Sequence, residues 1–352
     1  MKRFLKIVLF TFIGIFLLLI FIAKTPFSFT SKTSNADFSH IQNKNLKGNE
    51  KVVDIAMLGA HDALSFNIKA SSKIDPNDKD METYSNGFVK FMLDGIIMRN
   101  AKAQKSSASE LLKAGVRYFD IRLTYCDGVW YTMHGMISLP FSESLKQILS
   151  FLSETKELLI LDFQHVFVGN TDLDNLINLL QDTKINAKNI FHYAHYNSLT
   201  EPINSLTYSS ATSGGSGVIL IFGPAMNNKY IYQRETNLRS LWHNQPKSDN
   251  IIKAIKNEMS LILDDFSSYE SILRVNQAQQ TPWILSDIFG TIFGWSLLDK
   301  ANIHNPKILT SINMEQMFKA LPILMVDYAN CANKSFNTNI IKIINIYNSK
   351  LI

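Results

Sequence analysis

The chain has 352 residues, of which 46% are hydrophobic and 18% are charged. This balance excludes an intrinsically disordered protein, and two cysteines are too few for a disulfide-stabilised scaffold. The formal net charge is +5, but Lys2, Arg3 and Lys6 supply three of those charges, which leaves +2 for the rest of the chain. So small a positive charge argues against nucleic acid as a partner.

The first 23 residues are predicted to direct the chain into or across a membrane. Ile7 to Ala23 is a run of 17 uncharged residues between basic flanks. Its length approaches the roughly 20 residues that cross a bilayer, and it is apolar on every face. The basic flank before it favours translocation of the residues that follow. We therefore predict a signal-anchor with the catalytic domain outside the cytoplasm, and a cleaved signal peptide with a secreted product is the alternative.

Residues 24–50 are rich in Ser, Thr, Asn and Lys and have no sustained period, which predicts a flexible tether. Residues 51–350 are then one folded domain. Apolar strands are expected at Val52–Leu58, Val116–Leu123, Val129–Met133, Leu158–Phe163, Val218–Phe222 and Pro322–Tyr328. Helices are expected at Phe88–Lys113, Leu145–Leu152, Thr171–Leu180, 250–260, 268–279 and Thr338–Tyr347. Strands that alternate with helices over this length favour an α/β fold with a largely parallel sheet, such as a TIM-type (β/α)8 barrel, although only six strands are evident.

Polar side chains follow or end several of these strands. These residues are His61 and Asp62 after the first strand, Asp120 and Arg122 in the second, His134 after the third, and Asp162 and Asp327 in the later strands. Asp120 and Arg122 share one face because side chains alternate along a strand. The carboxyl ends of the strands form the catalytic rim of a β/α barrel. Two histidines with an arginine and carboxylates suit phosphodiester cleavage, in which one His accepts a proton, the other donates one, and Arg neutralises phosphate.

The same residues carry a family resemblance. Ile55–Ser65 (IAMLGAHDALS) and Gly115–Leu123 (GVRYFDIRL), followed by His134-Gly135, resemble the first two signatures of the phosphatidylinositol-specific phospholipase C X-domain family. Leu161–His165 is similar to the third strand of the X-domain-only members, and Met325–Asn330 is similar to the closing strand of the bacterial enzymes. The resemblance covers roughly residues 50 to 347. It implies a distorted or incomplete barrel that cleaves a phosphoinositide or a related phosphodiester in a membrane.

The resemblance also implies roles for individual residues. His61 would be the general base, His134 the general acid, and Arg122 the phosphate contact. Asp327 would orient His61, and Asp62 would assist near the leaving group. Asp120, Asp162 and His165 would support substrate binding.

The sequence departs from the family pattern at several positions, and two alternative functions remain open. Asp62 and Arg122 stand where calcium-dependent relatives carry metal ligands, so we expect no metal cofactor. Leu58-Gly59-Ala60 replaces the usual Pro-Gly-Thr, and Asp162–His165 lacks the lysine of the bacterial enzymes, which leaves the headgroup open. The alternatives are a glycerophosphodiester phosphodiesterase, for which no His-Arg pair is present, and a catalytically silent headgroup-binding module.

Two further pairs of residues carry weaker predictions. His192 and His195 are expected to be polar loop histidines, because no third metal ligand accompanies them. Cys126 and Cys331 are expected to stay unpaired, because the strands that carry them should be about 9–10 Å apart.

Overall fold

The computed structural model describes residues 7–15, 17–18, 32–195, 198–281, 296–331 and 333–351. Ten strands form one sheet. They are β1 (Met57–Ala60), β2 (Val116–Cys126), β3 (Val129–His134), β4 (Met136–Pro140), β5 (Leu158–Phe167), β6 (Gly217–Phe222), β7 (Ile231–Gln233), β8 (Leu238–Leu241), β9 (Leu273–Gln277) and β10 (Ile323–Val326).

Eight of these strands follow one another in the order β7-β6-β5-β2-β1-β10-β9-β8, and every pairing along this path is parallel. Within the described part of the chain no pairing joins β7 to β8, so the barrel is open between these two strands. β3 and β4 extend β2 as an antiparallel hairpin. The incomplete parallel α/β barrel is therefore as predicted.

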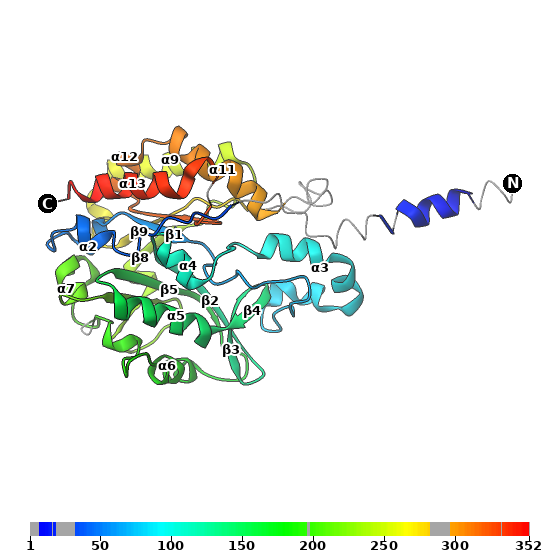
Figure 1. Cartoon of the computed structure of the whole chain (residues 1–352), viewed down its shortest axis with the longest axis horizontal. Helices are drawn as coiled ribbons and strands as arrows, with labels where there is room; N and C mark the ends of the chain where they lie inside the picture. Colours follow the sequence, from blue (N-terminus) through cyan, green and yellow to red (C-terminus); the bar gives the residue numbers. More distant parts are fainter. Residues whose placement is uncertain are drawn as a thin grey trace.

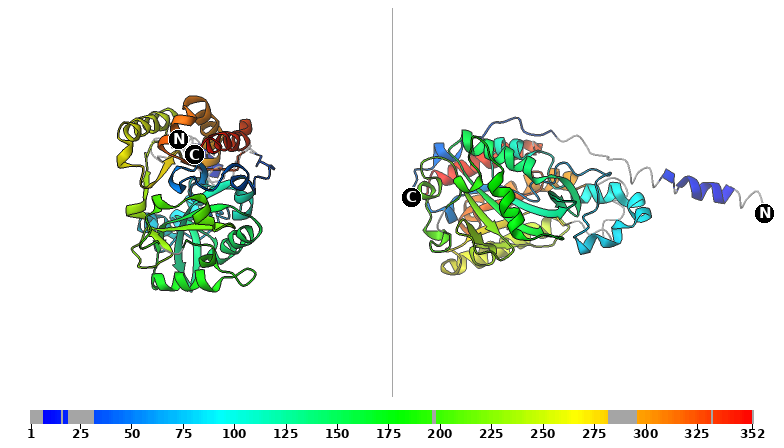
Figure 2. Two further views of the ribbon diagram at one scale, coloured as in Figure 1. Left: turned by 90° about the vertical axis from the view of Figure 1, so that its left-hand side faces the viewer. Right: turned by 90° about the horizontal axis from the view of Figure 1, so that it is seen from below.

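Helices surround the strands (Figures 1 and 2). The longer ones are α3 (Gly87–Ala101), α5 (Phe141–Glu154), α6 (Leu173–Asp182), α9 (Ser248–Asp264), α11 (Leu297–Ser311) and α13 (Phe336–Asn348). The shorter ones are α2 (Gln42–Asn45), α4 (Ala108–Lys113), α7 (Tyr208–Thr212), α8 (Arg234–Asn237) and α12 (Met314–Ala320). In Figure 1, α5 and α6 lie below the sheet, and α9, α11, α12 and α13 lie above it.

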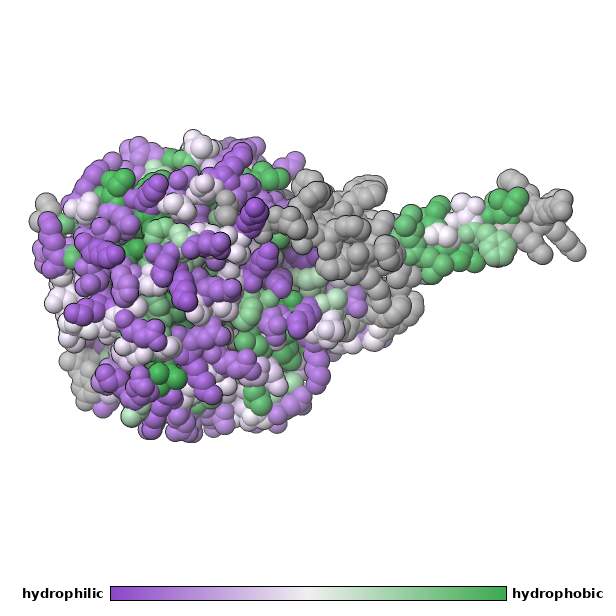
Figure 3. Space-filling model, in the orientation of Figure 1, coloured by the Kyte–Doolittle hydropathy of each residue, from purple (hydrophilic) through white to green (hydrophobic). Residues whose placement is uncertain are grey.

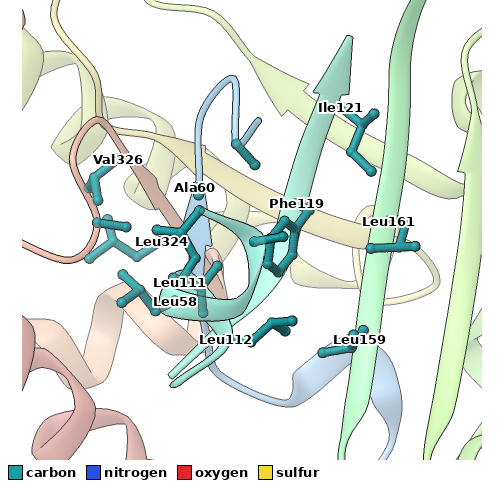
Figure 4. Close-up of a cluster of buried hydrophobic side chains, with 14 of the residues drawn as sticks. Leu58, Ala60, Leu111, Leu112, Phe119, Ile121, Leu159, Leu161, Leu324 and Val326 are labelled. Carbon is teal, nitrogen blue, oxygen red and sulfur yellow. The ribbon is translucent and has the colours of Figure 1, made fainter. Parts of the chain in front are cut away.

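The alternation of side chains divides the core into two shells. Phe119 and Ile121 of β2 point outward and belong to one buried cluster with Leu111 and Leu112 of α4. Figure 4 shows Ile121 nearer the arrowhead of β2 and Phe119 nearer the two leucines. Tyr118, which precedes Phe119 and faces the opposite side of β2, belongs to a separate cluster that fills the barrel interior. Asp120 and Arg122 continue the interior face of β2, toward the carboxyl ends of the barrel strands.

Three predicted elements need correction. The expected helix 88–113 is two helices, because Ser107 forms a capping box with Glu110 and starts α4 anew. The expected helix at 268–279 is wrong, since β9 occupies Leu273–Gln277 and all five of its residues are buried. The first strand, expected at Val52–Leu58, is β1 at Met57–Ala60, and Val52–Asp54 is a 3-10 helix. Gly59 therefore lies within β1, where a Cβ atom would be 3.0 Å from the Tyr118 ring.

The flexible tether is also wrong from residue 33 onward. Thr33 forms a bridge with Cys331, and the backbone N–H of Ser34 donates to Asn330. Further along, the backbone N–H groups of Gln42 and Asn43 donate to the buried carboxylate of Glu157. We call residues 33–45 the strap, because they fasten the N-terminal part of the chain to the barrel.

Residues 7–15 and 17–18 are helical and exposed, and they form the apolar projection in Figure 3. No helix in the described ranges is both long and apolar enough to cross a membrane. The remainder of the predicted segment 1–23, namely residues 1–6, 16 and 19–23, lies outside the described residues.

Candidate active site

A His–Asp pair joins the first and last strands of the barrel. His61 follows β1 and Asp327 follows β10, and these strands are neighbours with Ala60 opposite Val326. The Nδ1 atom of His61 lies 2.8 Å from Oδ1 of Asp327. A carboxylate only accepts hydrogen bonds, so Nδ1 carries a proton and donates it. Nε2 of His61 is then the ring atom available for proton transfer.

A guanidinium group faces that nitrogen. Nη2 of Arg122 lies 3.2 Å from Nε2 of His61 and 3.4 Å from Oδ2 of Asp120. Its Nε lies 2.5 Å from Oδ1 of Asp62, whose side chain is fully buried. Asp62 has a φ of 41°, a left-handed conformation that Asp tolerates better than most residues. This turn, held by the Asp62 N–H donating to Asp120, aims the carboxylate of Asp62 back at Arg122.

A second histidine lies across from the first. His134 ends β3, and its Nδ1 lies 2.8 Å from the carbonyl oxygen of Ala101 and 2.9 Å from Oδ2 of Asp62. Both partners are acceptors, so Nδ1 of His134 is a donor and its Nε2 is free to exchange a proton. The ring centroids of His61 and His134 are 5.7 Å apart at an interplanar angle of 80°.

Two opposing effects set the pKa values in this cluster: burial disfavours each charged form, and neighbouring opposite charges favour it. Burial lowers the pKa of His61, but the carboxylates of Asp62 and Asp327 outweigh burial and raise it to about 9. Burial raises the pKa of Asp62, but Arg122 and both histidines outweigh it and hold this pKa well below its usual value. Burial raises the pKa of Asp327, and the proximity of His61 opposes that rise. Asp62 thus remains an anion that links Arg122 to His134.

A cavity of about 430 Å³ opens over the cluster. Its wall includes His61, Arg122, His134 and Asp327, together with His165. The pairing of β2 with β5 shifts at this level, because Ile121 lies opposite Phe163 whereas Arg122 lies opposite His165. This bulge turns both Gln164 and His165 toward the cavity. Burial and the charge of Arg122 lower the pKa of His165.

The chain resembles several known proteins in sequence and in fold. No protein-family model matches the chain. A variant-surface-glycoprotein phospholipase C from Trypanosoma brucei brucei is 29% identical over 240 residues, which are 65% of this chain and 65% of the relative. The PI-PLC X domain-containing protein 3 of Danio rerio is 30% identical over 138 residues, which are 37% of this chain and 42% of the relative. These matches thus span less than two thirds of each of these two relatives.

A solved structure of the phosphatidylinositol-specific phospholipase C from Listeria monocytogenes superimposes with a TM-score of 0.57 at 19% identity. The superposition covers 87% of this chain and 98% of the bacterial enzyme, and it extends the likeness of fold to nearly the whole domain. The chain is a relative of the phosphatidylinositol-specific phospholipase C X-domain proteins.

Within this relationship, two predicted substrate contacts need correction. Asp120 and Asp162 are fully buried and do not line the cavity. Asp162 accepts a hydrogen bond from the Tyr118 hydroxyl at 2.6 Å and pairs with Arg234 at 3.1 Å. Asp120 accepts hydrogen bonds from the backbone N–H of Asp62 and from the guanidinium group of Arg122. Both carboxylates therefore position cationic side chains from behind the wall instead of contacting a ligand.

Other parts of the wall were missed from the sequence. The amide side chains of Gln277 and Gln279, the indole of Trp242 and the amide of Asn100 line the cavity. Gln277 ends β9 and Trp242 follows β8, and neither strand was predicted. Gln104, which donates to the carbonyl groups of both His61 and Val326, was missed because nothing in its local sequence marks it.

The site itself contains a cluster of potential metal ligands. The one group of three potential ligands found in the described ranges is His61, Asp62 and Asp120, whose ligand atoms lie within 4.8 Å of one another. Arg122 already bonds to both of these carboxylates. His195, considered above with His192 as a possible metal ligand, pairs with a carboxylate: its Nε2 lies 2.9 Å from Oε2 of Glu201. Cys126 and Cys331 are both free, as predicted.

Proposed function

We propose that the chain is a phosphodiesterase of the phospholipase C type that cleaves phosphatidylinositol or a closely related lipid without a metal ion. The observation that carries the proposal is the placement of two histidines with protonated Nδ1 atoms around one Arg–Asp pair: His61 contacts Arg122, and Asp62 contacts both Arg122 and His134. The relatives named above, which include phospholipases C, support the same reaction class.

The proposed reaction begins with the hydroxyl group that neighbours the phosphate on the headgroup. Nε2 of His61 removes the hydroxyl proton, and the resulting oxygen attacks phosphorus. The bond from phosphorus to the diacylglycerol oxygen breaks, and Nε2 of His134 supplies a proton to that oxygen. A cyclic phosphodiester and diacylglycerol are the balanced products. Arg122 neutralises the charge that grows on the phosphate oxygens.

The carboxylates complete this assignment. Asp327 fixes the tautomer of His61 and stabilises its imidazolium form once the proton has arrived. Asp62 contacts both Arg122 and His134, so it couples the phosphate-binding cation to the acid that protonates the leaving group. Because the guanidinium of Arg122 sits between Asp62 and Asp120, it supplies positive charge where a divalent ion would otherwise bind and would repel that ion.

The cavity favours a headgroup that carries several hydroxyl groups. Amides from Gln164, Gln277 and Gln279 offer both donors and acceptors, which suits hydroxyl recognition. Trp242 is 56% exposed, and its indole N–H donates to the Thr281 hydroxyl, which holds the ring at the mouth of the cavity. An exposed aromatic face at this place offers a stacking surface for an inositol ring.

We further propose that residues 1–23 keep the domain on a membrane outside the cytoplasm. The strap enters the barrel at Thr33 and Ser34, which contact Cys331 and Asn330 shortly after the catalytic Asp327. The chain thus leaves the domain beside the catalytic rim. The nine residues from 24 to 32 span at most about 30 Å, so the rim stays close to the lipid that it would cleave.

Two experiments test these proposals separately. The full chain is incubated with vesicles of phosphatidylinositol, phosphatidylcholine or phosphatidylglycerol, each with and without excess chelator, and diacylglycerol is measured. We expect release from phosphatidylinositol alone, unchanged by chelator, and release slowed by about 10²–10⁴-fold in the His61→Ala variant. Equal release from phosphatidylcholine, or recovery only with calcium, would overturn the proposal. Cell fractionation tests the location, since a soluble form shortened by about 25–36 residues would mean signal cleavage.

A further inference from the structure

A second cavity lies on the flank of the barrel, away from the catalytic residues. It has a volume of about 890 Å³ and opens between α6, the segment 184–192 and the residues that lead into β7. None of the residues that line it lines the catalytic cavity. We call this second cavity the flank cavity.

The flank cavity is lined by basic side chains and by no carboxylate. Lys184, Lys188 and Lys229 contribute three ammonium groups, and His192 adds an imidazole. No Asp or Glu occurs among the described residues of the lining. Three positive charges around one hollow create a local field that the small net charge of the chain does not reveal.

Aromatic rings hold two of these lysines in place. Nζ of Lys188 lies 5.9 Å from the centroid of the Tyr193 ring, and Nζ of Lys229 lies 5.6 Å from that of Tyr230. These distances suit cation–π attraction, which limits the positions that the flexible lysine side chains sample. The Phe191 and Tyr230 rings pack against each other at 5.1 Å and form an apolar part of the lining.

A tight turn sets the spacing of Lys184 and Lys188. Ile185 and Lys188 exchange two backbone hydrogen bonds of 3.0 and 2.9 Å around Asn186 and Ala187. Both central residues have positive φ values, 50° for Asn186 and 63° for Ala187. Alanine rarely adopts this conformation, because its Cβ atom crowds the following carbonyl oxygen. The turn places Lys184 and Lys188 on its two arms, at the edge of the same cavity.

We propose that the flank cavity binds a small polyanion that carries two or more phosphate groups. Lysine ammonium groups bind phosphate as compact point charges, and three of them match at least two phosphate groups in charge. The volume falls in the range of cavities that hold one small molecule. The ligand is either a soluble polyphosphorylated compound or a phosphate-bearing lipid headgroup, because both present the same chemistry to the lysines.

The test compares two variants of the full chain with equal charge. In the first, Lys184→Gln and Lys188→Gln are combined. In the control, the exposed Lys253→Gln and Lys256→Gln of α9 are combined, which removes the same charge elsewhere. Titration calorimetry with inositol hexakisphosphate measures the soluble source. Co-sedimentation with phosphatidylcholine vesicles, with and without diacylglycerol pyrophosphate, measures the lipid source. Neither inositol hexakisphosphate nor diacylglycerol pyrophosphate contains a phosphodiester bond of the proposed substrate type.

We expect saturable binding of one of these probes at physiological salt. Affinity should fall about tenfold for each lysine replaced in the first variant, the loss expected for one charge-assisted hydrogen bond, and should stay unchanged in the control. Cleavage of phosphatidylinositol should be the same in both variants, which separates this proposal from the catalytic one. The proposal is overturned if neither probe binds, if the control loses affinity equally, or if a single-stranded RNA oligonucleotide binds more tightly than either probe.

Discussion

The hydrogen bond between His61 and Asp327 gives the sharpest mechanistic prediction. Asp327→Asn keeps the shape of the side chain and removes its charge. Both groups are buried, and opposite charges with centres about 4 Å apart attract by about 4 kcal/mol at an effective dielectric constant of 20. Since one pKa unit corresponds to 1.36 kcal/mol, the pKa of His61 should fall by about two to three units from its value of about 9.

The pH dependence of kcat/KM on a water-soluble chromogenic inositol phosphodiester measures this fall. The general base acts only when unprotonated, so activity of the parent enzyme should rise as pH approaches 9. In the variant, the same ascending limb should move to lower pH, while the maximal rate falls by about 10²–10⁴-fold because the imidazolium loses its counter-charge. An ascending limb that stays in place, or moves to higher pH, would refute the assignment of His61 as base and Asp327 as its partner.

The remaining predictions concern the same cluster. His61→Ala and His134→Ala should each lower turnover by about 10²–10⁴-fold, whereas His165→Ala, which alters the wall alone, should cost less than about tenfold in steady-state assays. Activity should survive excess chelator, and Arg122→Lys should still be damaging because an ammonium group lacks the planar two-pronged contact; loss on chelation that calcium restores would contradict this. The raised pKa of His61 contributes stability that is fully present below the unfolded-state pKa of about 6.5 and is lost as pH rises through about 9. The free energy of unfolding in urea should therefore decline by up to about 3 kcal/mol over this pH window. A free energy of unfolding that stays constant from pH 6.5 to 9 would contradict this prediction.

The proposed catalytic cluster was predictable because its residues sit where the sequence pattern is strongest. His61, Asp120, Arg122 and Asp327 lie in or directly after buried apolar strands that are adjacent in the barrel. In a parallel barrel the carboxyl ends of such strands meet at one rim, so their order along the chain is enough to bring them together. Whether a given polar residue faces the cavity or lies behind it was not predictable, as Asp120 and Asp162 illustrate.

The missed strands have a physical reason. β7, β8 and β9 contain three, four and five residues, too few for a clear period. In β9, the fully buried Arg274 is accommodated because it donates to the carbonyl groups of Ala320, Tyr269 and Ile272. Those acceptors come partly from a segment more than forty residues away, and no local pattern indicates that a buried arginine will find them.

Helix α11 was missed for a similar reason. Pro306 lies inside it, and a proline there leaves the carbonyl group of Asn302 without its usual helical donor. The side chain of Asn333, from beyond β10, donates to that carbonyl oxygen instead. The strap shows the same dependence on distant partners, because its polar composition resembles a linker until Glu157 accepts its backbone N–H groups.

The central claim is that two histidines and an arginine drive attack by a neighbouring hydroxyl of the headgroup on the phosphate. Phosphorus NMR during cleavage of phosphatidylinositol by the full chain, in excess chelator, tests it most directly. The proposed mechanism predicts that a five-membered cyclic phosphodiester appears first and accumulates, and that His134→Ala slows its formation. Appearance of an acyclic phosphate monoester as the first product, with no cyclic intermediate at any time, would contradict the claim.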